Sequence, residues 1–407
     1  MRILLLAEVS AETVIGGAER VLREQALGLA ARGHAVQLLT RALGATSCDE
    51  VRVGGATERR YRVDGAGTWS HIRSTIRESV RQLDRVMEAG PFDMAIIHQS
   101  LAGLGPLWLR RRAAIEWVYV CHSLAHEEYR TRTQPAATIL GRIRQGVHAW
   151  ARRAVEWFVM RRCARVVVLS EFMRQRVLAT HGIPSDRIML VPGAADPGIF
   201  RPAANRMDAR QALGLPTERT ILFTVRNLVP RMGLETLLAA VDAVPAVRER
   251  CLVVIGGEGP LRAALEDGIR RRGLEGTVRL TGFIPEARLV DYYRAADLVV
   301  MPTAQLEGFG LVTVEALACG TPVVGTPVGA IPEVLNQIDP VLVSHGADSR
   351  SLADALSVVL ARMREPGQQD RWSRAGRRLV EQRYNWTRHC ADLLQASSNQ
   401  TATRKAA

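Results

Sequence analysis

The sequence contains almost no lysine. Only Lys405 among its 54 basic residues is a lysine, and against 41 acidic residues the formal net charge is +13. Such an excess indicates an anionic partner, whether a nucleotide, an acidic membrane or nucleic acid, although nearly exclusive use of arginine also fits a codon bias. Nucleic-acid binding further requires clustered basic residues with interleaved aromatics, and an aromatic content of 5% argues against this class.

Patterns that hold metals or disulfides are missing as well. The cysteines show no C-x-x-C spacing, and no D-x-D triplet occurs in the chain. We therefore expect no metal site, no bound cofactor and no disulfide framework, but free buried thiols as in a reducing cytosol. The cysteines are Cys48, Cys121, Cys163, Cys251, Cys319 and Cys390.

Long hydrophobic runs are also absent. No stretch reaches the roughly 18 apolar residues that a membrane span requires, and residues 1–7 are too short for a signal peptide because Glu8 interrupts them. We expect a cytoplasmic protein. Its 407 residues, with 47% hydrophobic and 23% charged content, suffice for two folded domains of ordinary size.

Short apolar runs alternate with helical patterns along the chain. This alternation predicts an α/β fold with a parallel sheet in each half. The predicted strands cover residues 2–7, 35–40, 93–98, 117–122, 164–170, 220–225, 251–255, 278–284 and 298–301. Prolines and glycines between residues 189 and 202 mark a connection, so we expect a first domain at 1–196, a linker at 197–203 and a second domain at 204–386.

One stretch joins an apolar strand to a short helix at 311–318. The first N–H groups of that helix lack partners and carry the positive end of its dipole, so an anion can bind there. Gly308 and Gly310 would let the backbone close on the anion. Glu307 and Glu315 frame the start of the helix, and a buried carboxylate needs donors such as sugar hydroxyls.

This stretch, followed by Gly320-Thr-Pro-Val-Val and Gly329-Ala-Ile-Pro-Glu333, resembles the signature of retaining glycosyltransferases of family 4. The resemblance covers residues 15–395 and implies the GT-B architecture, in which two Rossmann-like parallel-sheet domains face each other across a cleft. It also implies that a final helix at 387–397 crosses back to the first domain, after which we expect a disordered tail at 398–407. The implied reaction moves a hexose from a UDP- or GDP-linked donor to an acceptor on a glycan, a lipid-linked sugar or a small natural product.

The resemblance implies roles for individual residues at the donor site. Glu307 would meet the hydroxyls of the donor sugar, Glu315 those of the ribose, and the backbone around Phe283 the nucleobase. The other implied donor contacts are Gly16, Gly17, Gly257, Ile284, Gly308, Phe309, Gly310, Leu311 and Val312. For Gly16 and Gly17 the alternative is a tight turn without a ligand.

One loop of the second domain departs from the family pattern. Aligned on Gly233, the family's lysine position is Met232 and its arginine position is Asn227. Arg226 and Arg231 are each displaced by one residue, and we assign them to the diphosphate because a guanidinium group binds phosphate oxygens in a bidentate manner. Without a D-x-D triplet to hold a cation, these arginines and the helix N-terminus would stabilise the leaving group.

His122 stands at the carboxyl end of a predicted strand, where ligands of open α/β sheets gather. The resemblance implies a histidine near the donor sugar at this point. We assign the role to His122 and, on weaker grounds, to His98 at the end of the preceding strand. The alternative is a hydrogen-bonded structural histidine.

Residues 136–162 predict a long basic amphipathic helix. The residues that share its apolar face are Leu140, Ile143, Val147, Trp150, Ala154 and Trp157, and six arginines surround them. Such a helix either docks on an anionic membrane, here as a peripheral contact at the inner face, or packs against the protein with its arginines in solvent. The sequence leaves the oligomeric state open.

Other functions share some of these features. A retaining glycosidase places two carboxylates ~5 Å apart, whereas the resemblance puts Glu307 and Glu315 at different parts of a donor. Phosphorylases of the same architecture hold pyridoxal phosphate on a lysine, and Lys405 in the tail is unsuited to this role. A nucleotide-sugar epimerase stays open, as does a non-catalytic subunit that docks on a membrane or a partner, although the intact glutamates and glycines argue against a decayed site.

Overall fold

The computed structural model describes residues 1–14, 16–42, 50–65, 67–109, 115–133, 136 and 138–405, with side chains described as far as residue 395. The chain divides into two compact units. The first comprises Met1–Arg130, Pro135–Pro192 and Trp386–Ala407, and the second Thr131–Gln134 and Gly193–Asn385. The chain thus passes into the second unit at Gly193 and returns to the first at Trp386.

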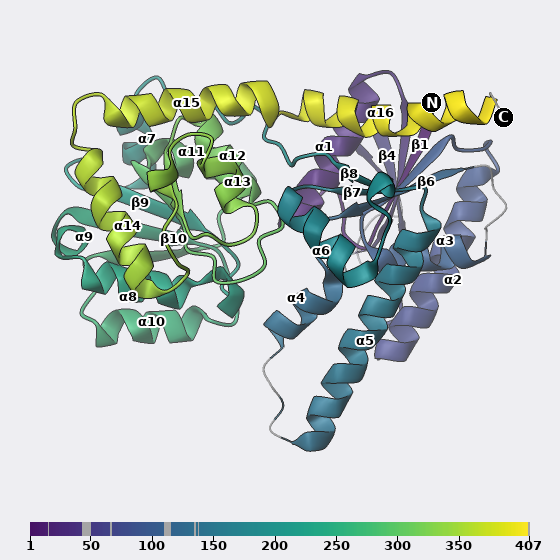
Figure 1. The fold of residues 1–407 in the computed structure, drawn as a ribbon, viewed down its shortest axis with the longest axis horizontal. Helices are drawn as coiled ribbons and strands as arrows, with labels where there is room; N and C mark the ends of the chain where they lie inside the picture. Colours follow the sequence, from purple (N-terminus) through teal and green to yellow (C-terminus); the bar gives the residue numbers. More distant parts are fainter. Residues whose placement is uncertain are drawn as a thin grey trace. The chain divides into compact units, whose positions relative to one another are not determined.

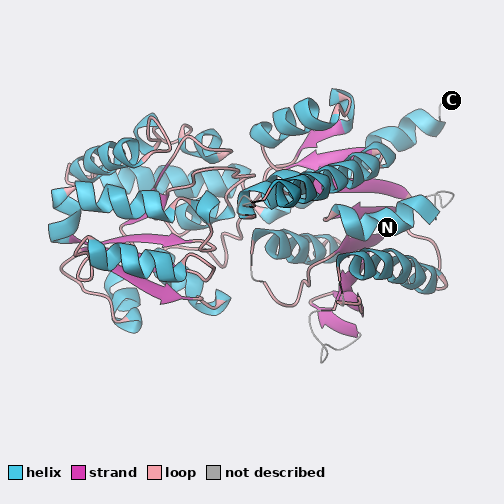
Figure 2. Cartoon of the chain, turned by 90° about the horizontal axis from the view of Figure 1, so that it is seen from below, coloured by secondary structure: helices cyan, strands magenta, loops and turns pink. Residues whose placement is uncertain are grey.

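The first unit is built on an eight-stranded sheet, of which Figure 1 labels β1, β4, β6, β7 and β8. The strand order is β3-β4-β2-β1-β5-β6-β7-β8. Its strands are β1 (Arg2–Ala7), β2 (Ala35–Arg41), β3 (Glu50–Val53), β4 (Ala56–Tyr61), β5 (Met94–Ile97), β6 (Glu116–Cys121), β7 (Arg165–Val168) and β8 (Ile188–Leu190). β3 pairs antiparallel with β4, and the other pairs are parallel. The central strands are continuous apolar runs because both faces of the sheet are covered by helices, as Figure 2 shows.

Helices connect most of the strands of the first unit. They are α1 (Gly17–Ala31), α2 (Thr68–Met87), α3 (Ser100–Leu109), α4 (Ala125–Arg132), α5 (Ile139–Arg162), α6 (Glu171–His181), a short 3-10 helix (Ser185–Arg187) and the returning α16 (Trp386–Lys405). Helix α16 lies against α1, since a Cβ on Gly28 would come within 2.6 Å of Sγ of Cys390. It continues to Lys405, so the segment predicted as a disordered tail is helical up to this residue.

The second unit holds a five-stranded sheet with the order β11-β10-β9-β12-β13, and all its pairs are parallel. The strands are β9 (Thr220–Val225), β10 (Cys251–Gly256), β11 (Val278–Gly282), β12 (Leu298–Met301) and β13 (Val323–Gly325). The helices are α7 (Arg206–Leu213), α8 (Leu234–Ala243), α9 (Pro245–Arg250), α10 (Arg262–Arg271), α11 (Glu286–Ala295), α12 (Leu311–Ala318), α13 (Ile331–Leu335), α14 (Ser349–Arg362) and α15 (Gln368–Arg383), with 3-10 turns at Pro230–Met232 and Pro340–Leu342.

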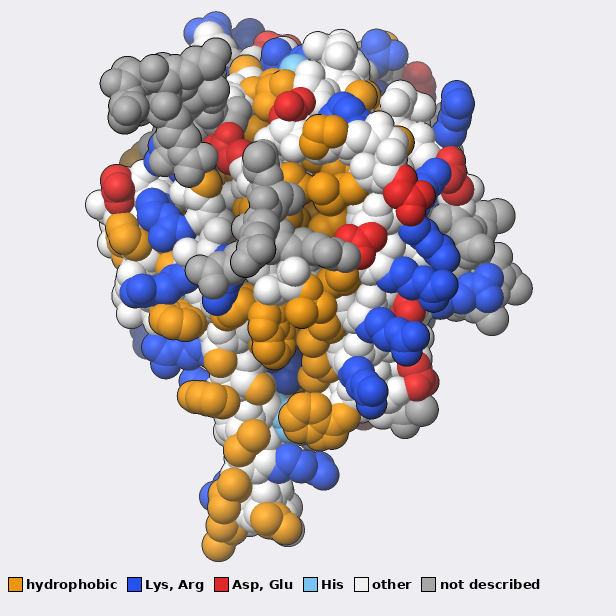
Figure 3. Space-filling model, turned by 90° about the vertical axis from the view of Figure 1, so that its right-hand side faces the viewer, with side chains coloured by type: hydrophobic (Ala, Val, Ile, Leu, Met, Phe, Trp, Pro, Cys, Tyr) orange, Lys and Arg blue, Asp and Glu red, His pale blue; other side chains and the backbone are white. Residues whose placement is uncertain are grey.

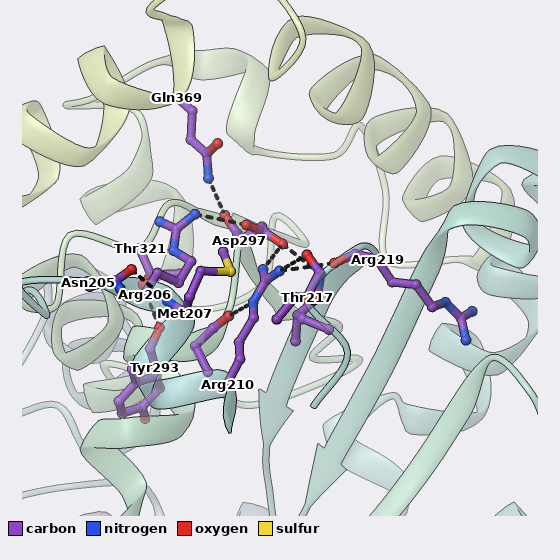
Figure 4. A network of polar contacts seen from close by, with 12 residues as sticks. Asn205, Arg206, Met207, Arg210, Thr217, Arg219, Tyr293, Asp297, Thr321 and Gln369 are labelled. Carbon is purple, nitrogen blue, oxygen red and sulfur yellow. Dashed lines mark hydrogen bonds and ion pairs between the residues drawn. The ribbon is translucent and has the colours of Figure 1, made fainter. Parts of the chain in front are cut away.

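A partly buried carboxylate joins the amino ends of β9 and β12. Asp297 accepts from the guanidinium of Arg210, from Arg206 at 2.8 Å and from the backbone N–H of Ile221 at 2.7 Å. Figure 4 shows this network, in which Gln369 also donates to the Asp297 carbonyl oxygen at 3.2 Å. Because Arg210 is only 2% exposed, the network fixes the two central strands of the sheet at the end opposite their carboxyl ends.

The α/β fold with two parallel-sheet domains is therefore confirmed. Five of the six cysteines are free and buried, as expected, and Cys48 lies outside the described residues. Within the described part of the chain, no helix is both long enough and apolar enough to cross a membrane.

Candidate active site

The strand order of the second sheet reverses between β9 and β12. These two strands are hydrogen-bonded neighbours, although β10 and β11 come between them in sequence. The crevice outside the carboxyl ends of such a pair is where open α/β sheets bind ligands. The loop after β12 is fixed to the loop after β9 because the N–H groups of Ala304 and Gln305 donate to the carbonyl oxygen of Arg231 at 2.9 and 3.1 Å.

The carboxylate of Glu307 follows β12 and lies between Arg226 and Thr303. Nη2 of Arg226 donates to Oε2 of Glu307 and, over 2.8 Å, to Oγ1 of Thr303. The threonine hydroxyl in turn lies 3.3 Å from the same carboxylate oxygen. Arg226 is only 7% exposed, so this is a largely buried ion pair that holds the Glu307 carboxylate in one place.

The residue before Glu307 has a strained backbone. Leu306 has φ of 53°, and among the described residues no other non-glycine has a positive φ. Strain of this kind costs about 1–3 kcal/mol, persists only where surrounding contacts enforce it, and clusters at functional sites. Nη1 of Arg231 donates to the Leu306 carbonyl oxygen at 2.8 Å, so the second displaced arginine helps to fix the loop that carries Glu307.

Two glycines permit the close packing of these loops. A Cβ on Gly329 would lie 2.0 Å from the carbonyl oxygen of Glu307, and one on Gly233 would lie 1.8 Å from that of Pro302. Both glycines also have left-handed φ values, of 63° and 70°. A larger residue at either position would displace the loop that carries the carboxylate.

The N-terminus of α12 follows directly on this loop. Its N-cap residue is Gly310, with φ of 81°, and no side chain caps the helix. The N–H groups of Leu311 and Val312 in the first turn therefore have no side-chain acceptor at the cap. An uncapped helix start next to buried cations is suited to binding phosphate.

The structure gives Glu315 and Phe309 partners inside the protein. Glu315 on α12 is 2% exposed, and the hydroxyl of Tyr293 donates to its Oε2 at 2.8 Å. Phe309 is 5% exposed, with its ring centroid 5.7 Å from that of Tyr384. The Phe309 side chain thus packs in the interior, and its backbone is the part left for a donor contact.

Three more predicted donor residues lie beyond the carboxyl ends of β10 and β11. The N–H of Gly257 donates to the carbonyl oxygen of Gly282 at 2.7 Å, and a Cβ on Gly257 would lie 1.9 Å from the carbonyl oxygen of Arg226. The Phe283 ring is 54% exposed, whereas Ile284 is 8% exposed. Phe283 therefore presents an apolar face to solvent at this edge of the sheet.

In the first unit, polar side chains gather at the carboxyl ends of β1, β5 and β6. Nδ1 of His98 and Nε2 of His122 lie 3.1 Å apart and the rings stack. Burial lowers the pKa of both histidines, that of His122 to about 4, so both are neutral near pH 7 and one donates to the other. Glu8 directly follows β1, and burial raises its pKa although the Arg41 cation and the N–H groups of Leu101 and Ala102 act in the opposite direction.

A buried acid fixes the loop that leads to Gly16 and Gly17. Helix α1 begins at Gly17, with Gly16 as an extended N-cap residue and no side-chain cap. Glu58 on β4 is fully buried and accepts from two backbone N–H groups of this loop at 3.2 and 3.3 Å. Arg60 reaches from the same strand to Glu12 at 2.6 Å.

The predicted site residues thus fall into one group in each unit. The second unit brings together Glu307, Arg226, Arg231 and the start of α12, and the first pairs His122 with His98. Sequence reasoning missed Thr303, Tyr293 and Glu8. Glu8 and Thr303 could have been predicted, because they follow the carboxyl ends of β1 and β12, where open α/β sheets bind ligands. Nothing in the sequence linked Tyr293 to Glu315.

Two family models match the sequence. The model described as Glycosyltransferase Family 4 matches residues 15–198, and the one described as glycosyl transferases group 1 matches residues 205–379. The D-inositol 3-phosphate glycosyltransferases of Mycobacterium tuberculosis and Mycobacterium bovis are 33% identical to the chain over 356 residues, which is 85% of this chain and 71% of theirs.

Solved structures share the fold. Sucrose-phosphate synthase from Thermosynechococcus elongatus superposes with a TM-score of 0.82 at 23% identity, covering 99% of this chain and 100% of that one. HepE from Anabaena, in complex with UDP and glucose, gives a TM-score of 0.76 at 17% identity, covering 98% and 100%. The family models, the mycobacterial relatives and this shared fold show that the chain belongs to the family 4 and group 1 glycosyltransferases of the GT-B fold.

Proposed function

We propose that the protein is a retaining, metal-independent transferase that moves a hexose from a nucleoside diphosphate sugar to an acceptor on a glycan, a lipid-linked sugar or a small natural product. The observation that carries the proposal is the Arg226–Glu307 pair at the switch point, directly before the uncapped start of α12. A carboxylate that accepts sugar hydroxyls thus lies beside a helix end that attracts phosphate.

The chemical difficulty of such a transfer is the charge on the departing diphosphate. In the proposed reaction the bond from the anomeric carbon to the phosphate oxygen breaks, a bond to the acceptor oxygen forms, and the acceptor proton passes to the departing phosphate. The N–H groups of Leu311 and Val312 and the cations of Arg226 and Arg231 would stabilise that phosphate as preorganised donors. Nε of Arg226 is buried without a hydrogen-bond partner in the described part of the chain. This N–H group is therefore available to donate a hydrogen bond to a ligand.

The remaining roles follow from position. Attack from the face on which the diphosphate leaves would retain the configuration of the sugar. The neutral His122, at the end of β6, would hydrogen-bond the donor sugar, and Glu315 with Tyr293 would meet the ribose hydroxyls. The exposed ring of Phe283 would lie against the nucleobase. The structures of HepE contain UDP or UDP-glucose, which makes uridine donors the first to test and guanosine donors the second.

The test is a thermal-shift and calorimetric panel of nucleoside diphosphates and their hexoses. A ligand that binds only the folded state raises the melting temperature, so we expect a shift with one nucleotide series. The increment that the nucleotide adds should be the same with and without chelator, whatever the melting temperature of the unliganded protein in each buffer. NMR of the donor then separates the reactions, since an epimerase would convert the donor without an acceptor. Absence of any nucleotide binding would overturn the proposal in favour of a non-catalytic docking subunit.

We also propose that the first unit contacts an anionic membrane through α5, as a peripheral protein at the cytoplasmic face. Most residues of its predicted apolar face do not pack against the protein. Their exposed fractions are 78% for Ile139, 77% for Leu140, 58% for Ile143, 58% for Val147, 69% for Trp150 and 45% for Trp157. Figure 3 shows apolar side chains along the projecting segment at the bottom of the view, and exposed patches of this kind mark interaction sites.

Charge favours a membrane as the partner. Exposed arginines flank the apolar face, among them Arg142, Arg144 and Arg153, and tryptophan with arginine is typical of interfacial helices. We expect the protein to sediment with phosphatidylglycerol vesicles but not phosphatidylcholine vesicles, and less at high salt. The double variant Ile143→Ser/Trp150→Ser should lose this binding, whereas Val358→Ser, which changes an equally apolar exposed residue of α14, should not. Dimerisation through α5 without vesicle binding would contradict the proposal.

A further inference from the structure

Helices α4, α5 and α6 bring three metal-binding side chains together in the interior of the first unit. Glu156 of α5 is fully buried, and His126 of α4 and His181 at the end of α6 are each 4% exposed. Nδ1 of His126 lies 2.8 Å from Oε2 of Glu156, and Nε2 of His181 lies 3.8 Å from the same oxygen. All three ligand atoms lie within 4.8 Å of one another.

His181 is incompletely satisfied within this cluster. Neither of its ring nitrogens has a hydrogen-bond partner among the described residues. A neutral imidazole has one donor and one acceptor, and burying such groups without partners is destabilising.

We propose that His126, Glu156 and His181 bind a divalent transition metal ion of the zinc class. Two imidazoles and one carboxylate are a ligand set that zinc accepts, with distances of about 2.0–2.2 Å to the ion. A tetrahedral ion with such bonds separates its ligands by roughly 3.3 Å, which lies between the His126–Glu156 distance of 2.8 Å and the His181–Glu156 distance of 3.8 Å. The fourth position would be taken by water.

The surroundings support the carboxylate as a ligand and limit the affinity. Oε1 of Glu156 accepts from the N–H of Ala125 at 2.6 Å, an outer contact of the kind that orients metal ligands. The cation of Arg153, which donates to the carbonyl oxygen of Thr180 at 2.8 Å, interacts electrostatically with His181 and would oppose a metal. The rival occupant is a buried water that bonds His181 to Glu156.

An ion at this position would fix the start of α4 to α5 and α6. The segment that it would hold follows directly on β6 and His122, which is one of the proposed donor contacts. The ion would therefore act by positioning this segment and would take no part in transfer, which leaves the proposed metal-independent chemistry at Glu307 unchanged. Sequence reasoning found no metal site because the three ligands come from separate helices and no local motif contains them.

The test uses full-length protein freed of metal with a chelator. We expect one equivalent of Co²⁺ to give the intense visible absorption of a tetrahedral site, Zn²⁺ to displace it, and Zn²⁺ to raise the melting temperature. His181→Gln, which preserves a buried hydrogen-bonding group, should abolish both effects, whereas His345→Ala at an exposed position should retain both. Wild-type protein that shows neither Co²⁺ absorption nor a Zn²⁺-dependent shift would overturn the proposal and assign the cluster to water.

Discussion

The most informative perturbation is Glu307→Gln, which removes one charge from the Arg226–Glu307 pair and keeps its shape. The exposed fractions of the two side chains are 5% and 12%, so the remaining guanidinium would be nearly buried without a counter-charge. Breaking a buried pair costs about 3–5 kcal/mol. Because the glutamine oxygen can still accept from Arg226, we expect a loss of about 2–3 kcal/mol, at or below the lower end of that range.

The assay for this loss is calorimetric unfolding. The second unit contains 197 residues, a size at which 1 kcal/mol shifts the melting temperature by about 2–4 °C. We therefore expect its transition to fall by about 4–12 °C. The double variant Arg226→Met/Glu307→Gln should recover part of this, because replacing both members of a buried pair costs less than removing one. Glu258→Gln, which affects an exposed pair with Arg262, should change stability by less than about 1 kcal/mol.

The same variant tests the proposed role in transfer. A hydrogen bond to a charged group is worth about 1.5–3 kcal/mol, so loss of the carboxylate should lower kcat/KM for sugar transfer by about 10- to 150-fold. Affinity for the nucleoside diphosphate, which lacks the sugar, should change by less than about threefold. Wild-type transfer would refute the role of Glu307, and equal losses of transfer and diphosphate affinity would move Glu307 from the sugar to the phosphate.

Three further outcomes follow from the structure. Gly329→Ala should lower the melting temperature and transfer more than Gly182→Ala, because both have left-handed φ but only the first would bring Cβ against Glu307. Asp297→Asn should destabilise the second unit by about 3 kcal/mol in urea unfolding, since it leaves Arg210 buried without a counter-charge. The pKa of His122, about 4 when folded, lies below that of the unfolded chain, so the unfolded state binds more protons and stability should fall as pH drops from about 6.5 to 4. His122→Gln should flatten this slope in melting curves.

The sequence best predicts those elements whose two ends are marked by nearby residues such as glycine. Helix α12 spans Leu311–Ala318 as predicted, because glycine precedes and follows an apolar run. The hairpin of β3 and β4 was not predicted, since its residues are largely charged and polar and Glu58 is buried by contacts with a distant loop. Short polar edge strands take their structure from neighbours, which a local pattern does not contain.

The same holds for the predicted site: residues within one segment could be predicted, and contacts between distant segments could not. Glu307 and the glycines around it are recognisable because they form one continuous segment. Arg226 was assigned to phosphate, yet in the structure it also pairs with Glu307 across 81 positions of sequence. Its second function depends on the parallel pairing of β9 with β12, and no spacing within either loop encodes that pairing.

Helix α5 shows how far a helical period can mislead about packing. The pattern correctly predicts the helix. The residues that the helix buries are Ala149, Glu156, Val159 and Met160, whereas most of its predicted apolar face is exposed. An isolated helix gains little from burying a carboxylate and exposing tryptophans. The arrangement becomes favourable if Glu156 binds a metal ion in the interior and the exposed apolar face of α5 binds a membrane. The metal experiment tests the first condition, and the vesicle experiment tests the second.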